Sequence, residues 1–363
     1  MGDWSARTGR SDYRWLIDRT YELNKGVMPA GQKSGDAIEG NFISRAIDDT
    51  GWWALAWVQA YDVTRDAKFL NTAVTIANYM HSYWDGVCGG GVWWNRERTY
   101  KNAVTIGLYV RLTAALHNRI AGDTLWLGRA NAGWNWFRAS GMINGSGLVN
   151  DGITGGCANN GQTVWTYNQG LAIGGAVELW RATGNASLLT QARQLADAAM
   201  NSAVLTRSGI LTESCDPANS CDDNQKQFKG IFMRYLMDLA DASGVAAYRT
   251  YAQRQVDSIW QYDRDSLNRI GQRWPAAPRT RATGAPRPPV SARCWPRRRS
   301  LRSRHGTDDV LCGDFPLWCV GGAERARIGP VRALLRDGPE GGRPLSHSRP
   351  RPLPGIMRPH RIL

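Results

Sequence analysis

A unit of two helices recurs about every 60 residues in this chain, and this repeat restricts the possible folds more than any other feature. Each unit has a helical pattern, a short break, a second helical pattern and then a loop rich in Gly and Trp. Four full copies span residues 52–84, 102–137, 167–200 and 228–260. The breaks are expected near Arg65 and Asp66, Gly122 and Asp123, Gly184 and Asn185, and Gly244.

The break residues suit the ends of helices. Gly122 and Gly184 can end the incoming helix, because glycine readily takes the left-handed conformation found there. Asp66, Asp123 and Asn185 can accept hydrogen bonds from the first turn of the outgoing helix. We therefore predict helical hairpins that turn at these points.

The two helices of each copy differ in pattern. The first is apolar on nearly all sides, whereas the second has one polar and one apolar face. We expect the first set to be central and the second set to be outer. The loops at residues 84–101, 140–165 and 206–227 all return from an outer to an inner helix, so they should gather on one functional face.

Hairpins around a ring predict an all-α fold, an (α/α)6 toroid that is incomplete at both ends. The segment Tyr13–Leu23 is expected to be the outer helix of a partial earlier copy, with its inner partner absent. An open α-solenoid is the alternative, and it would need a polar cap at each end. A broken ring exposes apolar helix faces, so the chain is expected to be poorly soluble and weakly active or inactive.

The net charge of +14 is very uneven along the chain. Residues 279–363 contain 18 Arg, no Lys and six acidic residues, while the rest is nearly neutral. We divide the chain into a helical domain at 1–274, lacking its first inner helix, and an Arg/Pro-rich tail at 275–363. The tail suits a reading-frame artefact, a disordered basic segment or a nucleic-acid-binding arm. Nucleic-acid binding would depend on this tail alone, so no nucleic-acid partner is expected.

Four of the seven cysteines lie in the helical domain, and Cys215 and Cys221 flank a short polar loop. This spacing predicts a disulfide and a secreted protein, with free thiols as the alternative. A metal site is disfavoured, because none of the five His lies at ligand spacing to these cysteines. The chain has no apolar run long enough to cross a membrane, and its first residues lack the apolar region of a signal peptide.

The paired acids Asp48 and Asp49 stand where the first full copy enters its inner helix. One of them could simply cap that helix. Two adjacent carboxyl groups can also divide into one ionised and one protonated group, as cleavage of a glycosidic bond requires. The 17 Trp, which cluster with Gly and polar residues, suit a groove that binds sugar rings.

Four ordered segments carry a family resemblance: DDTGWWALAWVQAYDVTRDAKFL, CGGGVWW with YKNAVTIGLYVRL, TYNQGLAIGGAVELWRATGN, and QFKGIFMRYL. Together they resemble glycoside hydrolase family 76, the endo-α-1,6-mannanases and their fungal cell-wall relatives, from about Asn41 to Trp274. The resemblance implies a secreted or cell-surface (α/α)6 enzyme that cleaves α-1,6-mannosidic bonds in mannan with retention. It implies no metal or cofactor, with Asp48 as nucleophile and Asp49 as general acid/base. Hydrolysis and transglycosylation onto another sugar both remain open, and we expect a monomer.

Other residues on the predicted face could contact the sugar. Amide and aromatic side chains suit hydroxyl groups and pyranose faces, although capping and packing are the alternative roles. The candidates are Trp52, Trp53, Trp93, Trp94, Asn102, Asp151, Tyr167, Asn168, Gln169 and Lys229.

Two other classes of function compete with this enzyme. A polysaccharide lyase or uronyl hydrolase on the same toroid would need basic groups for uronate, and the nearly neutral domain offers few. A catalytically inactive carbohydrate-binding protein or scaffold would keep the Trp residues without needing both aspartates.

Overall fold

The computed structural model describes residues 2–31 and 36–275. The Arg/Pro-rich tail lies outside the described residues except for Pro275, so its three alternative explanations stay open. Within the described part, ten α-helices and only four two-residue strands are present, which confirms the all-α prediction. No helix in this part of the chain combines the length and apolarity needed to cross a membrane.

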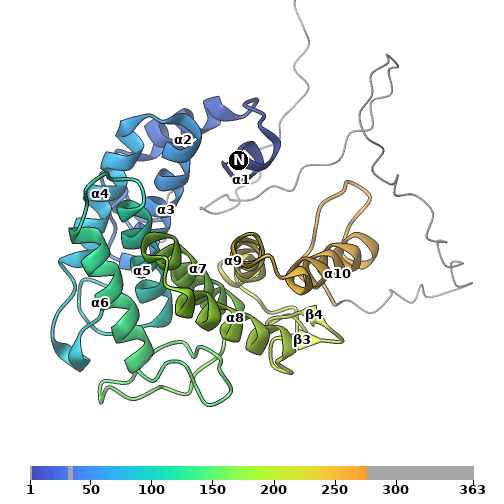
Figure 1. Ribbon diagram of the computed structural model, residues 1–363. Coiled ribbons are helices and arrows are strands. Elements are labelled where there is room, and N and C mark those ends of the chain that lie inside the picture. The colour runs from blue at the N-terminus through green and yellow to red at the C-terminus, as the bar shows by residue number, and fades with distance from the viewer. Residues whose placement is uncertain (1, 32–35, 276–363) are drawn as a thin grey trace, which may run out of the picture. The chain divides into compact units, whose positions relative to one another are not determined.

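The helices follow the predicted hairpin order (Figure 1). They are α1 (Gly2–Thr8), α2 (Arg14–Asn24), α3 (Ile47–Thr64), α4 (Ala67–His81), α5 (Ala103–His117), α6 (Leu125–Ala139), α7 (Thr166–Thr183), α8 (Ala186–Asn201), α9 (Phe228–Ser243) and α10 (Ala246–Tyr262). Two antiparallel strand pairs accompany them, β1 (Val27–Met28) with β2 (Ile38–Glu39) and β3 (Thr206–Arg207) with β4 (Ile210–Leu211). Two 3-10 helices, η1 (Val87–Gly89) and η2 (Gln225–Gln227), lie in the loops.

The inner helices α3, α5, α7 and α9 pack side by side in chain order, and α4, α6, α8 and α10 each pack on their inner partner. Helix α7 is enclosed along most of its length, with every residue from Thr166 to Leu179 buried. Its Gly170 allows α9 to approach closely, because a Cβ atom there would lie 2.7 Å from the Cα of Phe232. The prediction of an apolar inner set with an amphipathic outer set is therefore confirmed.

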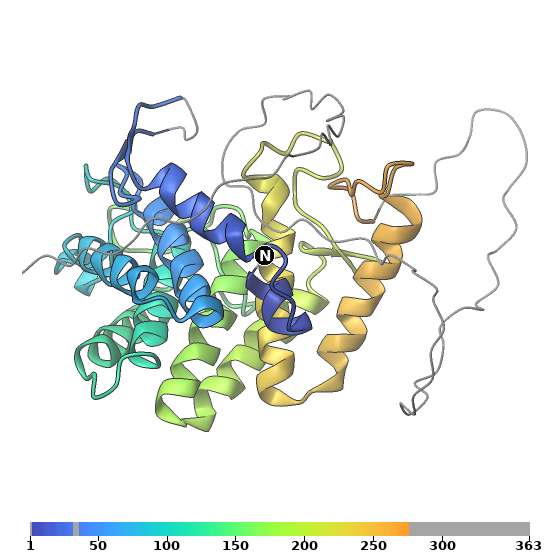
Figure 2. The same cartoon turned by 90° about the horizontal axis from the view of Figure 1, so that it is seen from above.

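The short helix α1 precedes α2 and contacts two of the inner helices. Asp3 of α1 pairs with Arg234 of α9 at 2.6 Å. Asp3 also accepts a hydrogen bond from Gln59 of α3. Figure 2 shows α1 in dark blue between α3 and α9. The polar bonds of α1 thus connect the first and last of the four long inner helices.

Three of the four predicted helix breaks are confirmed. Arg65 and Gly184 end their helices in the left-handed conformation, and Asp66 and Asn185 then accept a backbone hydrogen bond from the next helix. The break at Gly244 has the same left-handed form. The second break differs, because α5 already ends at residue 117, well before the predicted glycine, although the next aspartate still accepts hydrogen bonds from the first turn of α6.

A network of ion pairs joins the inner helices near their carboxyl ends, around a cavity of about 150 Å³. Glu178 of α7 lies at its centre, 3.0 Å from Arg119 in the turn after α5 and 3.0 Å from Arg181, and Arg111 of α5 pairs with Asp238 at 3.0 Å. Arg119 also forms a two-bond contact with Asp62 of α3, and Arg181 pairs with Asp238 of α9. Four inner helices are therefore connected through one set of charges.

The buried Glu178 should make folding stability depend on acid. Although burial raises its pKa, the surrounding arginines outweigh this and lower the pKa to about 2. A lowered pKa adds stability above the unfolded-state value of about 4.3, and this contribution is lost as the pH falls through 2. We expect Glu178→Gln to cost about 3 kcal/mol at pH 7, with the deficit shrinking toward pH 2. Urea unfolding at stepped pH measures this, and a deficit independent of pH would contradict it.

Candidate active site

The amino ends of the inner helices meet the long loops at the opposite end from the ion-pair network. The start of α3 is held by the loop before α5, because Ile47 N–H donates to the Trp94 carbonyl at 2.7 Å. The start of α5 is held by the next loop, because Ala103 N–H donates to the Asp151 carbonyl at 2.8 Å. These loops therefore do gather where the inner helices begin, as their order in the sequence predicts.

The paired aspartates occupy the first turn of α3. The residue that caps this helix is Ala46, so neither Asp48 nor Asp49 is the N-cap that the simplest interpretation required. Asp48 is half-buried and receives a hydrogen bond from the Trp94 side chain, whereas Asp49 is more exposed. The Oδ1 atom of Asp48 is buried and has no hydrogen-bond partner among the described residues. Both carboxyl groups are thus available for a role other than capping.

The electrostatic environment favours a proton on this pair. Burial and then the neighbouring charge of Asp49 raise the pKa of Asp48 well above its ordinary value, despite hydrogen bonds from Trp94 and the backbone that lower it. Burial and the charge of Asp36 raise the pKa of Asp49. Two close carboxyl groups of this kind do not both ionise easily, so one can act as an acid while the other is charged.

A third carboxyl group, that of Asp151, acts together with Asp48 on Tyr167, the second residue of α7. Burial raises the pKa of Tyr167 well above its usual value, and the charges of Asp151 and Asp48 raise it further. Asp151 itself accepts a hydrogen bond from the Tyr100 hydroxyl at 2.7 Å. Burial raises the pKa of Asp151, while the Tyr100 bond lowers it. The starts of α3 and α7 and the loop before α7 therefore place acidic groups around one tyrosine.

Several buried polar atoms at this end of the inner helices have no hydrogen-bond partner among the described residues. They are Asp48 Oδ1, Thr105 Oγ1 and both amide atoms of Asn168. The Asn168 amide nevertheless lies near enough to Asp151 to lower the pKa of that carboxyl. Buried polar groups are nearly always satisfied by protein, water or ligand. Such a concentration of them suits a site that binds a ligand rich in hydroxyl groups.

Three of the predicted contact residues have partners within the protein. Gln169 is buried, and its side-chain amide both donates to and accepts from the backbone of Val149 at 2.8 Å. Asn102 caps α5 by accepting the Thr105 N–H at 3.1 Å. Lys229 is buried and pairs with Asp216. These residues position the loops and helices around the site.

The predicted tryptophans separate into two groups. Trp94 contacts Asp48, and Trp52 is half-buried about one turn after it on α3. Trp93 instead donates its ring N–H to Asp85 at 2.7 Å, and Trp53 stacks on Trp57 within an aromatic cluster of the core.

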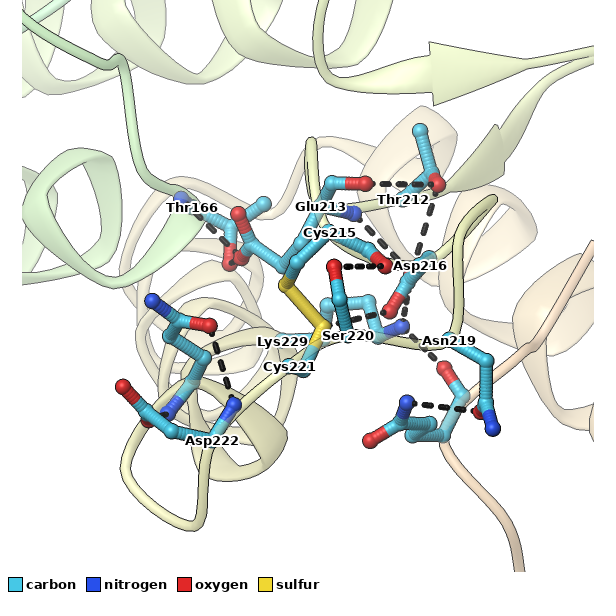
Figure 3. The surroundings of a disulfide bond; sticks show 12 residues. Thr166, Thr212, Glu213, Cys215, Asp216, Asn219, Ser220, Cys221, Asp222 and Lys229 are labelled. Carbon is cyan, nitrogen blue, oxygen red and sulfur yellow. Dashed lines mark hydrogen bonds and ion pairs between the residues drawn. A yellow bond between two sulfur atoms is a disulfide. The ribbon is translucent and has the colours of Figure 1, made fainter.

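Two residues that support the site were missed by sequence reasoning. Tyr100 precedes the predicted helix start, and only its contact with Asp151 in the folded chain reveals its role. Glu213 lies two residues before Cys215 and hydrogen-bonds to Thr166 at the start of α7 (Figure 3). Its place beside the predicted disulfide loop was the only signal in the sequence.

The disulfide prediction for Cys215 and Cys221 is confirmed, and a second disulfide joins Cys88 to Cys157. The second bond links the loop before α5 to the loop before α7. Within the described residues, the only His, Cys, Asp and Glu cluster with metal-ligand spacing is Cys215, Asp216 and Cys221. Its two sulfurs are bonded to each other, so this donor set does not suit a metal ion.

A family model, curated relatives and solved structures all match this chain to the same family. The model of glycosyl hydrolase family 76 matches residues 1–288. The mannan endo-1,6-alpha-mannosidase DCW1 of Saccharomyces cerevisiae is 31% identical over 62% of this chain and 54% of its own length. The DFG5 enzyme of Candida albicans, which has the same activity name, is 27% identical over 59% of this chain and 49% of its own. The chain thus spans about half the length of these curated relatives.

Solved structures show the same fold. The GH76A alpha-1,6-mannanase of Salegentibacter aligns with a TM-score of 0.63 at 24% identity, over 76% of this chain and 79% of its own. An inactive variant of that enzyme, with two consecutive aspartates replaced, was solved with an α-1,6-linked mannose tetrasaccharide. Dfg5 of Chaetomium thermophilum, solved with glucosamine, aligns with a TM-score of 0.65 at 20% identity, over 76% of this chain and 70% of its own. The paired helices are those of the (α/α)6 toroid, and the chain belongs to glycosyl hydrolase family 76.

Proposed function

We propose that this protein cleaves α-1,6-mannosidic bonds in mannan or a related mannose-containing glycan. The observation that carries the proposal is the Asp48–Asp49 pair at the start of α3, where burial and neighbouring carboxylates raise both pKa values and favour a retained proton. The names of the relatives and the mannose oligosaccharide bound by the Salegentibacter enzyme support the substrate. The helical domain at residues 1–274 would then be the catalytic domain.

In the proposed retaining mechanism, Asp48 is the nucleophile and Asp49 the general acid/base. Asp49 gives its proton to the glycosidic oxygen while Asp48 attacks the anomeric carbon, so that the bond to the leaving sugar breaks and a covalent mannosyl-aspartate forms. Asp49 then takes a proton from water, whose oxygen displaces Asp48. The greater exposure of Asp49 supports this order, because the leaving sugar and water must reach it.

This assignment of roles requires a proton transfer between the two aspartates. Asp48 is the less exposed of the two carboxyl groups, and burial raises its pKa, so the proton shared by the pair favours Asp48 before substrate binds. That proton must pass to Asp49 before Asp48 can attack. The hydrogen bond from Trp94, which favours the ionised form of Asp48, supports this transfer.

The remaining site residues suit recognition of the sugar. We propose that Trp52, Trp94, Asp151, Tyr167 and Asn168 contact the substrate. The unpartnered amide of Asn168 can both donate to and accept from a hydroxyl group. No metal or cofactor takes part in this mechanism.

An assay of linkage and stereochemistry tests the proposal. We expect purified protein to release oligosaccharides from unbranched α-1,6-mannan and to leave α-1,2- and α-1,3-linked mannans intact. Proton NMR during the reaction should show the α anomer of the new reducing end first, because two displacements at the anomeric carbon retain its configuration. First appearance of the β anomer would exclude the double displacement, and intact α-1,6-mannan would exclude the proposed substrate.

The acceptor of the mannosyl group can be examined in the same assay. Water and a sugar hydroxyl compete for one covalent intermediate, so added α-1,6-mannobiose should yield products longer than the donor if transglycosylation operates. We further propose that the protein is a monomer and that it is secreted or held at the cell surface; the two disulfides support the location.

A further inference from the structure

Glu213 is a buried carboxyl group that holds the start of α7 (Figure 3). Only 1% of the residue is exposed. Its Oε1 atom accepts the backbone N–H of Thr166 at 3.2 Å and also the Thr166 hydroxyl. Because the first N–H groups of a helix have no partner within the helix, Glu213 supplies a cap that Trp165, the N-cap residue, does not provide from its side chain.

The loop that carries Glu213 is itself firmly anchored. The backbone N–H of Glu213 donates to Asp216 at 2.9 Å, and Asp216 pairs with the buried Lys229 of α9. The Cys215–Cys221 disulfide closes this loop, as Figure 3 shows. The carboxyl group is therefore fixed from the side of α9, independently of the helix that it caps.

The residue after Thr166 is Tyr167, whose pKa is raised by the charges of Asp48 and Asp151. The Tyr167 ring stacks on Phe228, the first residue of α9, with 3.9 Å between ring centroids. Glu213 on one side and Phe228 on the other thus restrict the position of this tyrosine. A shift at the start of α7 would move Tyr167 relative to the aspartate pair.

The surroundings of Glu213 suit its uncharged form. Its Oε2 atom is buried and has no hydrogen-bond partner among the described residues, and an unpaired buried charge costs far more free energy than an unpaired neutral hydroxyl group. Burial raises the pKa of Glu213 to about 8. Two charged groups face Glu213. The charge of Lys229 of α9 lowers the pKa of Glu213, whereas the charge of Asp216, which pairs with Lys229, raises it. Asp263, just after α10, also acts on Lys229.

We propose that Glu213 is a positioning residue of the active site: as an un-ionised carboxyl group it holds the first turn of α7 and so fixes Tyr167 beside the Asp48–Asp49 pair. The consequence for catalysis rests on the proposed function, whereas the protonation and the placement of Tyr167 do not. These two parts can be tested separately.

The first experiment compares the thermal midpoints of the parent, Glu213→Gln and the exposed control Glu97→Gln between pH 5 and 8.5. A carboxyl group with a raised pKa in the folded state costs stability as the pH rises through its unfolded value toward 8. Glutamine cannot ionise, so the midpoint of Glu213→Gln should rise relative to the parent by several degrees across this range. The midpoint of the control should change with pH as that of the parent does. If the midpoint of Glu213→Gln also changes with pH as the parent's does, the proposal is wrong.

The second experiment reads Tyr167 directly by 19F NMR of protein labelled with fluorotyrosine, with the resonance assigned from Tyr167→Phe. Glu213→Gln should keep the parent chemical shift, because its amide oxygen can still accept both Thr166 hydrogen bonds. Glu213→Ala should move or broaden the resonance. Equal spectra for parent and Glu213→Ala, at unchanged folding, would overturn the positioning role.

Kinetics on α-1,6-mannotriose then measure the catalytic consequence. Glu213→Gln should stay within about threefold of the parent in kcat/KM, whereas Glu213→Ala should fall at least about tenfold, mainly in kcat. Equal losses in the two variants would contradict a role for the uncharged group. If the parent cleaves no mannan, the proposed function fails, and the two preceding measurements still decide the role of Glu213.

Discussion

Replacing either Asp48 or Asp49 with asparagine is expected to lower kcat on α-1,6-mannan by at least about 10³-fold, because each carboxyl group has a separate chemical task. Asparagine keeps the shape of aspartate, so folding and substrate binding should survive. The measurement is initial rate together with the affinity for α-1,6-mannotriose by calorimetry. A suitable control is Asp66→Asn, at the start of α4, where asparagine can replace the capping oxygen. Unchanged turnover in both Asp48→Asn and Asp49→Asn would remove the catalytic assignment.

The order of the two aspartates can be decided by rescue with azide on an activated aryl mannoside. Azide replaces water in the second step when the acid/base is missing, so Asp49→Ala should give α-mannosyl azide. When the nucleophile is missing, azide attacks directly, so Asp48→Ala should give the inverted β product. The opposite products would exchange the two roles while leaving the catalytic pair intact.

Lys229→Met is expected to cost about 3–5 kcal/mol in free energy of unfolding, because it leaves Asp216 buried without its charged partner. Lys226, three residues earlier, forms a similar pair with Asp223 on the surface. Lys226→Met should change stability by no more than about 0.5 kcal/mol. Urea unfolding of the two variants compares a buried and an exposed pair.

The double variant Asp216→Asn with Lys229→Met should recover part of this loss, because it removes the unpaired charge. The sequence suggested that Lys229 contacts substrate, and this comparison separates the two roles. A stable Lys229→Met protein with weakened mannotriose binding would favour direct contact over the buried ion pair.

The helix pairs could be predicted because their signals are local. The apolar periodicity and the capping residues Asp66 and Asn185 act within a few residues of the helix ends that they define. The end of α5 was misplaced because an irregular turn lies between the end of the helix and Gly122, and the local pattern does not show where the helix stops. Local patterns identified the hairpins but not every boundary.

The site was only partly predictable, because its contacts join distant segments. The aspartate pair stood out by its adjacency, but Gln169 gave no sign that its amide is used by Val149, 20 residues earlier. Glu213 contacts Thr166 across 47 residues, and nothing near either residue indicates that contact. The sequence alone therefore does not distinguish a polar residue at a helix start that binds substrate from one that supports a loop.

The position of α1 between α3 and α9 also has a consequence for folding. The Asp3–Arg234 ion pair joins residues more than 200 positions apart, so it can form only after nearly all the described helices have been synthesised. The hairpins from α3 to α10 have partners close in sequence and can pair early. We therefore expect α1 to dock late, after the other inner helices have assembled.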